Sequence, residues 1–210
     1  MRIAQFYLGA SLLPVANGLR RACRLDTSQR VLLSWLTIAV LLNYVEWAIG
    51  SRGHQTLWLQ HLSYPGYGAL GLEMLGRFAN EARLLRMARL GGLAYLAVWT
   101  ALMFTLEDGS AFSGYAGPIL WFMLSAASAG LLMRHIRSRT EVAFRDPVLL
   151  TGVATLLSYA PAIALEPLSK ALYAQQPGLV LALWESRAAL LIIGAFLYAF
   201  ALQWEQSPLS

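Results

Sequence analysis

Glu185 and Arg187 lie two residues apart inside the apolar run "ALWESRAALLIIG", residues 182–194. A charged side chain in a bilayer is costly unless it is paired or faces water, so intramembrane charges often mark functional sites. Residues two apart on a helix point to nearly opposite sides, so these two cannot easily pair with each other. Each therefore needs its own partner, and we predict that Arg187 faces the bundle interior and pairs with Glu46.

Polar and aromatic side chains in other apolar runs lie at a similar estimated depth. At about 1.5 Å per residue, the polar ones fall roughly 6–14 Å below the outer boundary. The predicted candidates for a ligand site or an ion-pair layer are Glu46, His61, Tyr64, Tyr159, Glu185 and Arg187, with Trp121 and Trp184 as deeper aromatic residues. The layer is either a structural lock between helices or a ligand site. For the histidine, a satisfied core position and a ligand or proton role are both open. For the two tryptophans, lining a cavity is one alternative, and core or lipid-facing packing is at least as well supported.

The composition is that of a membrane protein. The 210 residues are 58% hydrophobic and 13% charged, whereas soluble domains carry about 25% charged residues. Apolar segments run from end to end, so we predict one all-α transmembrane domain over residues 1–210. The net charge of +5 resides in short loops between apolar segments, which argues against a nucleic-acid partner.

Seven runs are long enough to cross a bilayer, which takes about 17–25 helical residues. They are too long for barrel strands, so helices are expected. The predicted fold is a seven-helix bundle with helices at about residues 3–19, 31–50, 55–76, 90–106, 112–133, 147–168 and 179–203.

Arginine is distributed unevenly over the predicted loops. The first, third and fifth loops are rich in arginine, whereas the second, fourth and sixth together hold only Arg52 and Lys170. The positive-inside rule then places the N-terminus outside and the C-terminus in the cytoplasm, in a bacterial inner membrane.

Several common chemistries lack their residues here. Cys23 is the single cysteine, so an intrachain disulfide and a cysteine-ligated metal are both excluded. Three histidines without a His-x-x-x-His pair argue against a zinc hydrolase, and no glycine-rich phosphate loop is present. We therefore expect no metal site and assign no catalytic residue.

Four segments resemble the microbial rhodopsins: "IAVLLNYVEWAIG" with Tyr44, "SYPGYGALGLEM" with Pro65, "ILWFMLSAA" with Trp121, and "LLSYAPAIAL" with Pro161. The resemblance implies a seven-helix bundle with its N-terminus outside. That family binds retinal through a lysine four residues after an acid in the last helix, and Ala189 stands four residues after Glu185. The chain is therefore rhodopsin-like without the Schiff-base lysine, and any pigment would be noncovalent.

Three classes of function remain. The favoured one is a non-enzymatic, receptor-like protein or accessory subunit whose outer-half cavity binds a lipid, a noncovalent pigment or another apolar ligand, and which acts through a protein partner or as a homo-oligomer. The second is an ion- or proton-coupled transporter or channel that uses Glu46 and Glu185. The third is a membrane enzyme acting on a lipid, with Glu185 or His61 as the acid–base residue. In the favoured class, the arginine-rich inner loops would contact anionic lipid headgroups or an acidic surface of a partner.

Overall fold

The computed structural model of the chain describes residues 2–138 and 144–204, the side chains of residues 2 and 4 excepted. Within these ranges the regular secondary structure is all helical, with no strand. The helical segments are α1 (Arg2–Arg20), α2 (Thr27–Gly50), α3 (Leu57–Phe78), α4 (Ala82–Thr105), α5 (Ala116–Arg137), α6 (Pro147–Tyr159), α7 (Ala162–Leu172) and α8 (Pro177–Ala201). Only Ala160 and Pro161 separate α6 from α7, so these two segments are parts of one interrupted helix.

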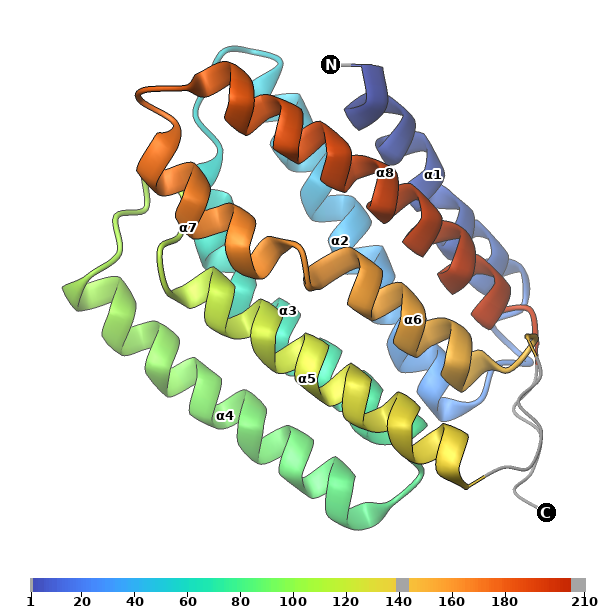
Figure 1. Cartoon of the computed structure of the whole chain (residues 1–210). Coiled ribbons are helices and arrows are strands. Elements are labelled where there is room, and N and C mark those ends of the chain that lie inside the picture. The colour runs from blue at the N-terminus through green and yellow to red at the C-terminus, as the bar shows by residue number, and fades with distance from the viewer. Residues whose placement is uncertain (1, 139–143, 205–210) are drawn as a thin grey trace.

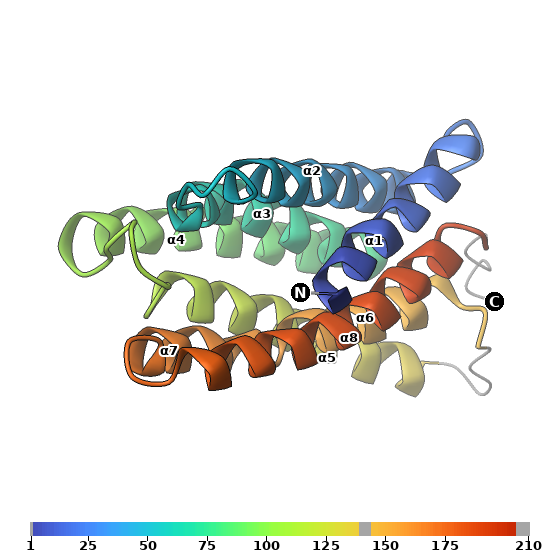
Figure 2. The same ribbon diagram turned by 90° about the horizontal axis from the view of Figure 1, so that it is seen from above.

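The segments form two layers (Figures 1 and 2). One layer contains α2, α3 and α4, and the other contains α5, α6, α7 and α8. Contacts between α3 and α5 join the layers at the centre, and α1 packs against both α2 and α8 along one side. The helices therefore surround a common interior, and neighbours in sequence pack side by side through short connections.

The outward faces of the helices are apolar. Among the described residues, five stretches are long and apolar enough to span a membrane: Thr27–Gly50, Ala82–Thr105, Ala116–Arg137, Pro147–Leu172 and Pro177–Ala201. Large side chains such as Leu93, Phe104 and Phe122 are exposed on them. The all-α prediction is confirmed, and these five stretches have the length and composition expected of an integral membrane protein.

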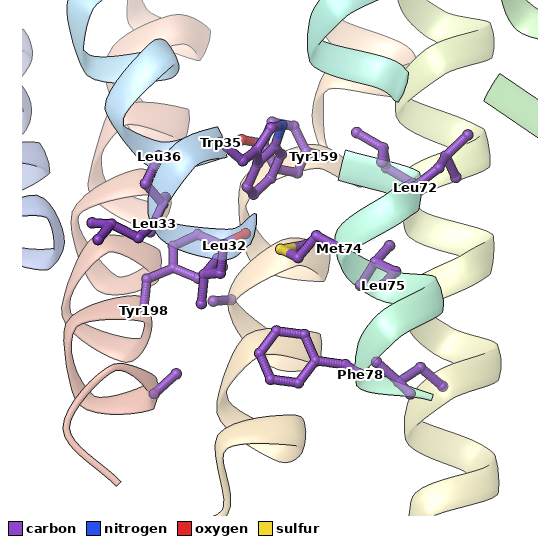
Figure 3. Close-up of a cluster of buried hydrophobic side chains, with 14 of the residues drawn as sticks. Leu32, Leu33, Trp35, Leu36, Leu72, Met74, Leu75, Phe78, Tyr159 and Tyr198 are labelled. Carbon is purple, nitrogen blue, oxygen red and sulfur yellow. The ribbon is translucent and has the colours of Figure 1, made fainter. Parts of the chain in front are cut away.

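A cluster of buried hydrophobic side chains lies where α2 and α3 meet the second layer (Figure 3). Leu32, Trp35 and Met74 are completely buried there, and the Trp35 ring lies 5.6 Å from that of Tyr159 in α6. Gly71 of α3 permits this approach, because a Cβ on it would lie 3.3 Å from the Trp35 ring and 2.8 Å from a leucine methyl of α5. Close helix contacts through small residues are typical of membrane bundles.

One end of the bundle carries most of the arginine residues. Arg77 and Arg89 both form ion pairs with Glu73, at 2.6 and 2.7 Å, and Arg134 pairs with Glu81. The connections between α2 and α3, α4 and α5, and α7 and α8 lie at the end of the bundle opposite to these ion pairs. We call these the arginine-rich end and the opposite end.

Several helix boundaries differ from the predicted ones by more than a residue or two. The α5 helix lies four residues further along the chain than the predicted 112–133, and the helix predicted to end at residue 168 continues to Leu172. The α4 helix begins at Ala82 rather than near residue 90, because arginine is a good helix former and its long side chain stays exposed on a helix surface. The α2 helix begins one turn early, because Asp26 and Gln29 form a capping box. The helix predicted over 147–168 is interrupted at Pro161, which has no N–H to continue the ladder.

The start of α5 depends on one buried carboxylate in the α4–α5 connection. Glu107 accepts hydrogen bonds from the N–H groups of Gly114, Tyr115 and Ala116 at 2.8–3.1 Å, and from the Ser113 hydroxyl at 2.9 Å. Its side chain has no exposed surface. Burial acts to raise the pKa of this carboxyl group, but the four hydrogen bonds outweigh it and the pKa lies below its ordinary value.

Replacing Glu107 by glutamine should lower the free energy of unfolding by about 2 kcal/mol at neutral pH, because charge-assisted hydrogen bonds are lost. Since the folded-state pKa is depressed, this contribution is complete above the unfolded pKa of about 4.3 and is lost as the pH falls through the folded value. Denaturation of both proteins in mild detergent over this pH range measures it. The neighbouring change Asp108→Asn is the control, because this exposed carboxylate accepts hydrogen bonds from the N–H and hydroxyl of Ser110. A wild-type advantage that stays constant below pH 4 would contradict the account.

Candidate functional site

A cavity of about 780 Å³ lies inside the half of the bundle near the opposite end. Every helical segment except α4 contributes to its wall. The lining residues are Tyr7, Leu8, Ala39, Leu42, Asn43, Glu46, Trp47, Gln60, Ser63, Tyr64, Tyr67, Trp121, Tyr159, Glu166, Leu181, Trp184, Glu185, Arg187, Ala188 and Leu191. Its volume falls within the roughly 300–1,000 Å³ of small-molecule sites, and a mainly apolar and aromatic wall with few polar groups is typical of them.

Seven of the eight candidates from the sequence line this cavity: Glu46, Tyr64, Trp121, Tyr159, Trp184, Glu185 and Arg187. The exception is His61, which is only 2% exposed and lies near the start of α3. Its Nε2 lies 2.9 Å from the carbonyl oxygen of Ala111. This contact ties α3 to the α4–α5 connection, which favours the structural interpretation of the histidine.

The predicted ion pair between Arg187 and Glu46 is wrong. Among the described residues, Glu46 has a weak contact with Gln60, whose amide donates over 3.5 Å. The Arg187 guanidinium instead lies 4.8 Å from the centre of the Trp184 ring, one turn earlier on the same helix, a cation–π arrangement. The depth estimated from the sequence placed both residues in the same polar layer. It gave no information on the direction in which each side chain points around its helix axis.

Arg187 also supports the break between α6 and α7. Because Pro161 lacks an N–H and α6 ends at Tyr159, the last carbonyl groups of α6 lose their helical donors. The Arg187 guanidinium donates to one of them, the Ser158 carbonyl, in a long hydrogen bond of 3.4 Å. A cation is also favourable at the negative end of the α6 dipole.

Glu166 of α7 was missed by the sequence reasoning, although it is more deeply buried than the predicted acids. It is 3% exposed, and its Oε1 accepts hydrogen bonds from the Trp121 indole at 2.6 Å and the Tyr64 hydroxyl at 3.2 Å. Its Oε2 has no hydrogen-bond partner among the described residues. The available signal was an acid in the apolar sequence "APAIALEPL", five residues after a helix-breaking proline.

Aromatic rings form the inner wall of the cavity. Trp121 stacks on Tyr159 with ring centres 5.0 Å apart and planes at 16°, and Tyr64 meets the Trp121 ring edge to face at 5.7 Å. Tyr67 shares a hydrogen bond with Tyr159 through the two hydroxyl groups. These contacts link α3, α5 and α6 into a rigid surface, since aromatic pairs in such geometries are favourable beyond their buried area.

The rim of the cavity reaches the outer surface of the bundle. Trp47 in α2 is 53% exposed and Leu181 in α8 is 59% exposed, and both line the cavity. Each lies about one turn from the helix end at the opposite end of the bundle. On α1, the Tyr7 hydroxyl accepts a hydrogen bond from Asn43 of α2 at 3.0 Å, which closes the cavity at a deeper level.

Comparison of the chain with protein-family models, curated proteins and solved structures found no match. The functional argument therefore depends on the residues and geometry of this chain.

Replacing Gly117 by alanine should disturb the Glu166 contacts, because a Cβ at position 117 would overlap Oε2 and lie 2.7 Å from Cδ of that side chain. We expect a loss of about 1–3 kcal/mol of stability, typical of overpacking. The same substitution at Gly130, also in α5 and with nothing within 4 Å of the added Cβ, should be neutral or slightly stabilising.

A Glu166→Ala background provides the matched test. If the carboxylate causes the clash, the cost of Gly117→Ala should largely disappear there. Equal costs in both backgrounds, measured by denaturation in detergent, would show that another contact is responsible.

Proposed function

We propose that this chain is a non-enzymatic integral membrane protein, receptor-like or an accessory subunit, whose cavity holds an amphipathic molecule. The observation that carries the proposal is the cavity itself: about 780 Å³ with an aromatic wall, a few polar groups and a rim on the apolar surface. The apolar and polar parts of an amphipathic ligand that enters from the bilayer would match the two kinds of side chain in this wall. With no enzymatic activity of its own, the protein would act through a protein partner or as a homo-oligomer.

The proposed topology has seven spans, with the interrupted helix α6–α7 counted once. The arginine-rich end would face the cytoplasm of a bacterial cell, which places the N-terminus outside. The cavity then lies in the outer half of the membrane. At the cytoplasmic face, exposed residues such as Arg83 and Arg86 of α4 are suited to contact anionic headgroups.

Filling the cavity tests the binding function. Ala188 is buried and lines the cavity, so Ala188→Phe should weaken the uptake of a lipid-like ligand by about tenfold or more. Ala94 lies exposed on α4, and Ala94→Phe should leave the uptake of this ligand unchanged. The measurement is the amount of amphipathic molecule that co-purifies in mild detergent, together with the rise in melting temperature on adding a polar lipid extract.

The same preparation tests for a pigment. Lys170 is not among the residues that line the cavity, and its amine lies 3.7 Å from Glu107, so a pigment there would be noncovalent. Visible absorbance that remains after gel filtration would identify one. If Ala188→Phe retains the co-purifying lipid and any pigment at the wild-type level, the binding function is contradicted.

Transport is the second candidate, and the interrupted helix favours it. In many transporters, broken helices next to a central cavity place their polar ends at the substrate or ion. Here α6 ends and α7 begins beside the cavity wall at Tyr159 and Glu166.

If the protein transports protons or cations, flux in proteoliposomes should fall at least tenfold in Glu46→Gln, because a carboxylate on the path is lost. Glu73→Gln, at the arginine-rich end and away from the cavity, should conduct like the wild type. Wild-type flux no higher than that of protein-free liposomes would exclude this candidate.

A further inference from the structure

Two acidic side chains and one basic side chain that line the cavity form no ion pair with one another among the described residues. Glu46, Glu166 and Arg187 all contribute to its wall. Among the described residues, neither of these two acids lies within ion-pair distance of the guanidinium. Opposite charges that share a low-dielectric space but do not touch can both be satisfied by a molecule that carries both signs.

Both signs also retain an unused hydrogen-bonding atom. Glu166 is 3% exposed, and its buried Oε2 lies against Gly117 of α5 without a hydrogen-bond partner among the described residues. The buried Nε of Arg187 likewise has no partner within the described ranges. The first is an acceptor that suits an ammonium, and the second is a donor on a group that matches phosphate geometry. Glu46 adds a second acceptor, which in the described part of the chain receives the long contact from Gln60 alone.

We propose that the cavity binds the headgroup of a phospholipid that carries a primary ammonium and a phosphate. The ammonium lies at Glu166, beside the Trp121 and Tyr64 rings, and the phosphate lies at Arg187. This inference depends on the proposed binding function, which requires only that some amphipathic molecule occupies the cavity.

The rim favours a lipid over a free zwitterion as the source of this headgroup. Trp47 and Leu181 are more than half exposed on the apolar, lipid-facing surface and also line the cavity. Leu8, Leu42 and Leu191 extend the apolar lining. Acyl chains can therefore remain in the bilayer between α2 and α8 while the headgroup reaches the polar side chains.

The chemistry also discriminates between headgroups. A trimethylammonium group has no N–H to donate to Glu166 Oε2, so a choline headgroup satisfies this acceptor less well. An anionic glycerol headgroup brings no cation to the two acids and adds a negative charge beside them. A primary ammonium supplies both the positive charge and the N–H donors that suit these acids.

The experiment is binding of short-chain phosphatidylethanolamine, phosphatidylcholine and phosphatidylglycerol to the purified full chain in detergent, followed by the change in tryptophan fluorescence. The ethanolamine lipid should bind about tenfold more tightly than either of the others. Glu166→Gln and Arg187→Gln should each weaken its binding by about 30-fold or more. Glu73→Gln and Arg86→Gln remove equal charges away from the cavity and should bind like the wild type.

The outcomes separate the inference from the function on which it depends. Equal binding of the three lipids, or preference for the glycerol lipid, would overturn the ammonium assignment while the binding function stands. Binding of water-soluble glycerophosphoethanolamine as tight as that of the lipid would overturn the membrane source. Binding of no lipid at all would overturn the inference and count against the function too. If a variant does not fold, competition between the ethanolamine and choline lipids on the wild type decides alone.

Discussion

The interruption between α6 and α7 is the constraint on which the cavity depends. A continuous helix over residues 147–172 would satisfy its own backbone and would direct its side chains in one regular spiral. Pro161 removes one donor from this ladder and separates the last carbonyl groups of α6 from the first turn of α7. In a bilayer, free backbone groups persist only where protein satisfies them or where they line a polar space. Arg187 of α8 satisfies one of these groups, so the break and the intramembrane charge explain each other.

The aromatic cluster gives this local irregularity a rigid surrounding. Trp35 packs against Tyr67, Tyr159 and Tyr198 with ring centres 4.8–6.0 Å apart, and its indole donates to the Tyr67 carbonyl at 3.0 Å. Tyr159, the last residue of α6, is thus held from α2 and α3. Because the end of α6 is fixed in this way, the start of α7 and its Glu166 are also directed to one place. The cavity wall is a continuation of the core.

The helices and most of the cavity were predictable from the sequence, and the reasons are physical. The hydrophobic length of each run determines where a helix can lie in a bilayer, and the rise per residue then gives the depth of its polar groups. The estimated depth alone assigned Glu46, Tyr64, Tyr159 and Glu185 to the same polar layer, and in the structure all four line one cavity. Antiparallel neighbours joined by short connections made this convergence expected.

Rotation and interruption were not predictable in the same way. Whether Arg187 points toward Glu46 or toward Trp184 depends on the angle of α8 about its own axis, and a uniformly apolar helix carries little periodic signal for that angle. The Glu166 carboxylate was missed because its depth and direction follow from the break at Pro161. A proline alone predicts a kink but not the side to which the second half turns.

The mixed charges of the cavity are difficult to explain by stability alone. A buried ion pair is often no more stabilising than apolar residues of the same volume, and separated buried charges are worse. The chain nevertheless keeps a guanidinium beside Trp184 and a carboxylate beside Trp121, in a bundle whose other interior residues are mostly apolar or aromatic. Arg187 has a structural role at the end of α6, but the free Oε2 of Glu166 has none among its described contacts. The Oε1 of Glu166 accepts hydrogen bonds from Trp121 and Tyr64, but a buried carboxylate oxygen left without a partner costs stability. A bound ligand would offset that cost, and for that reason the acid missed in the sequence is the residue on which the functional argument most depends.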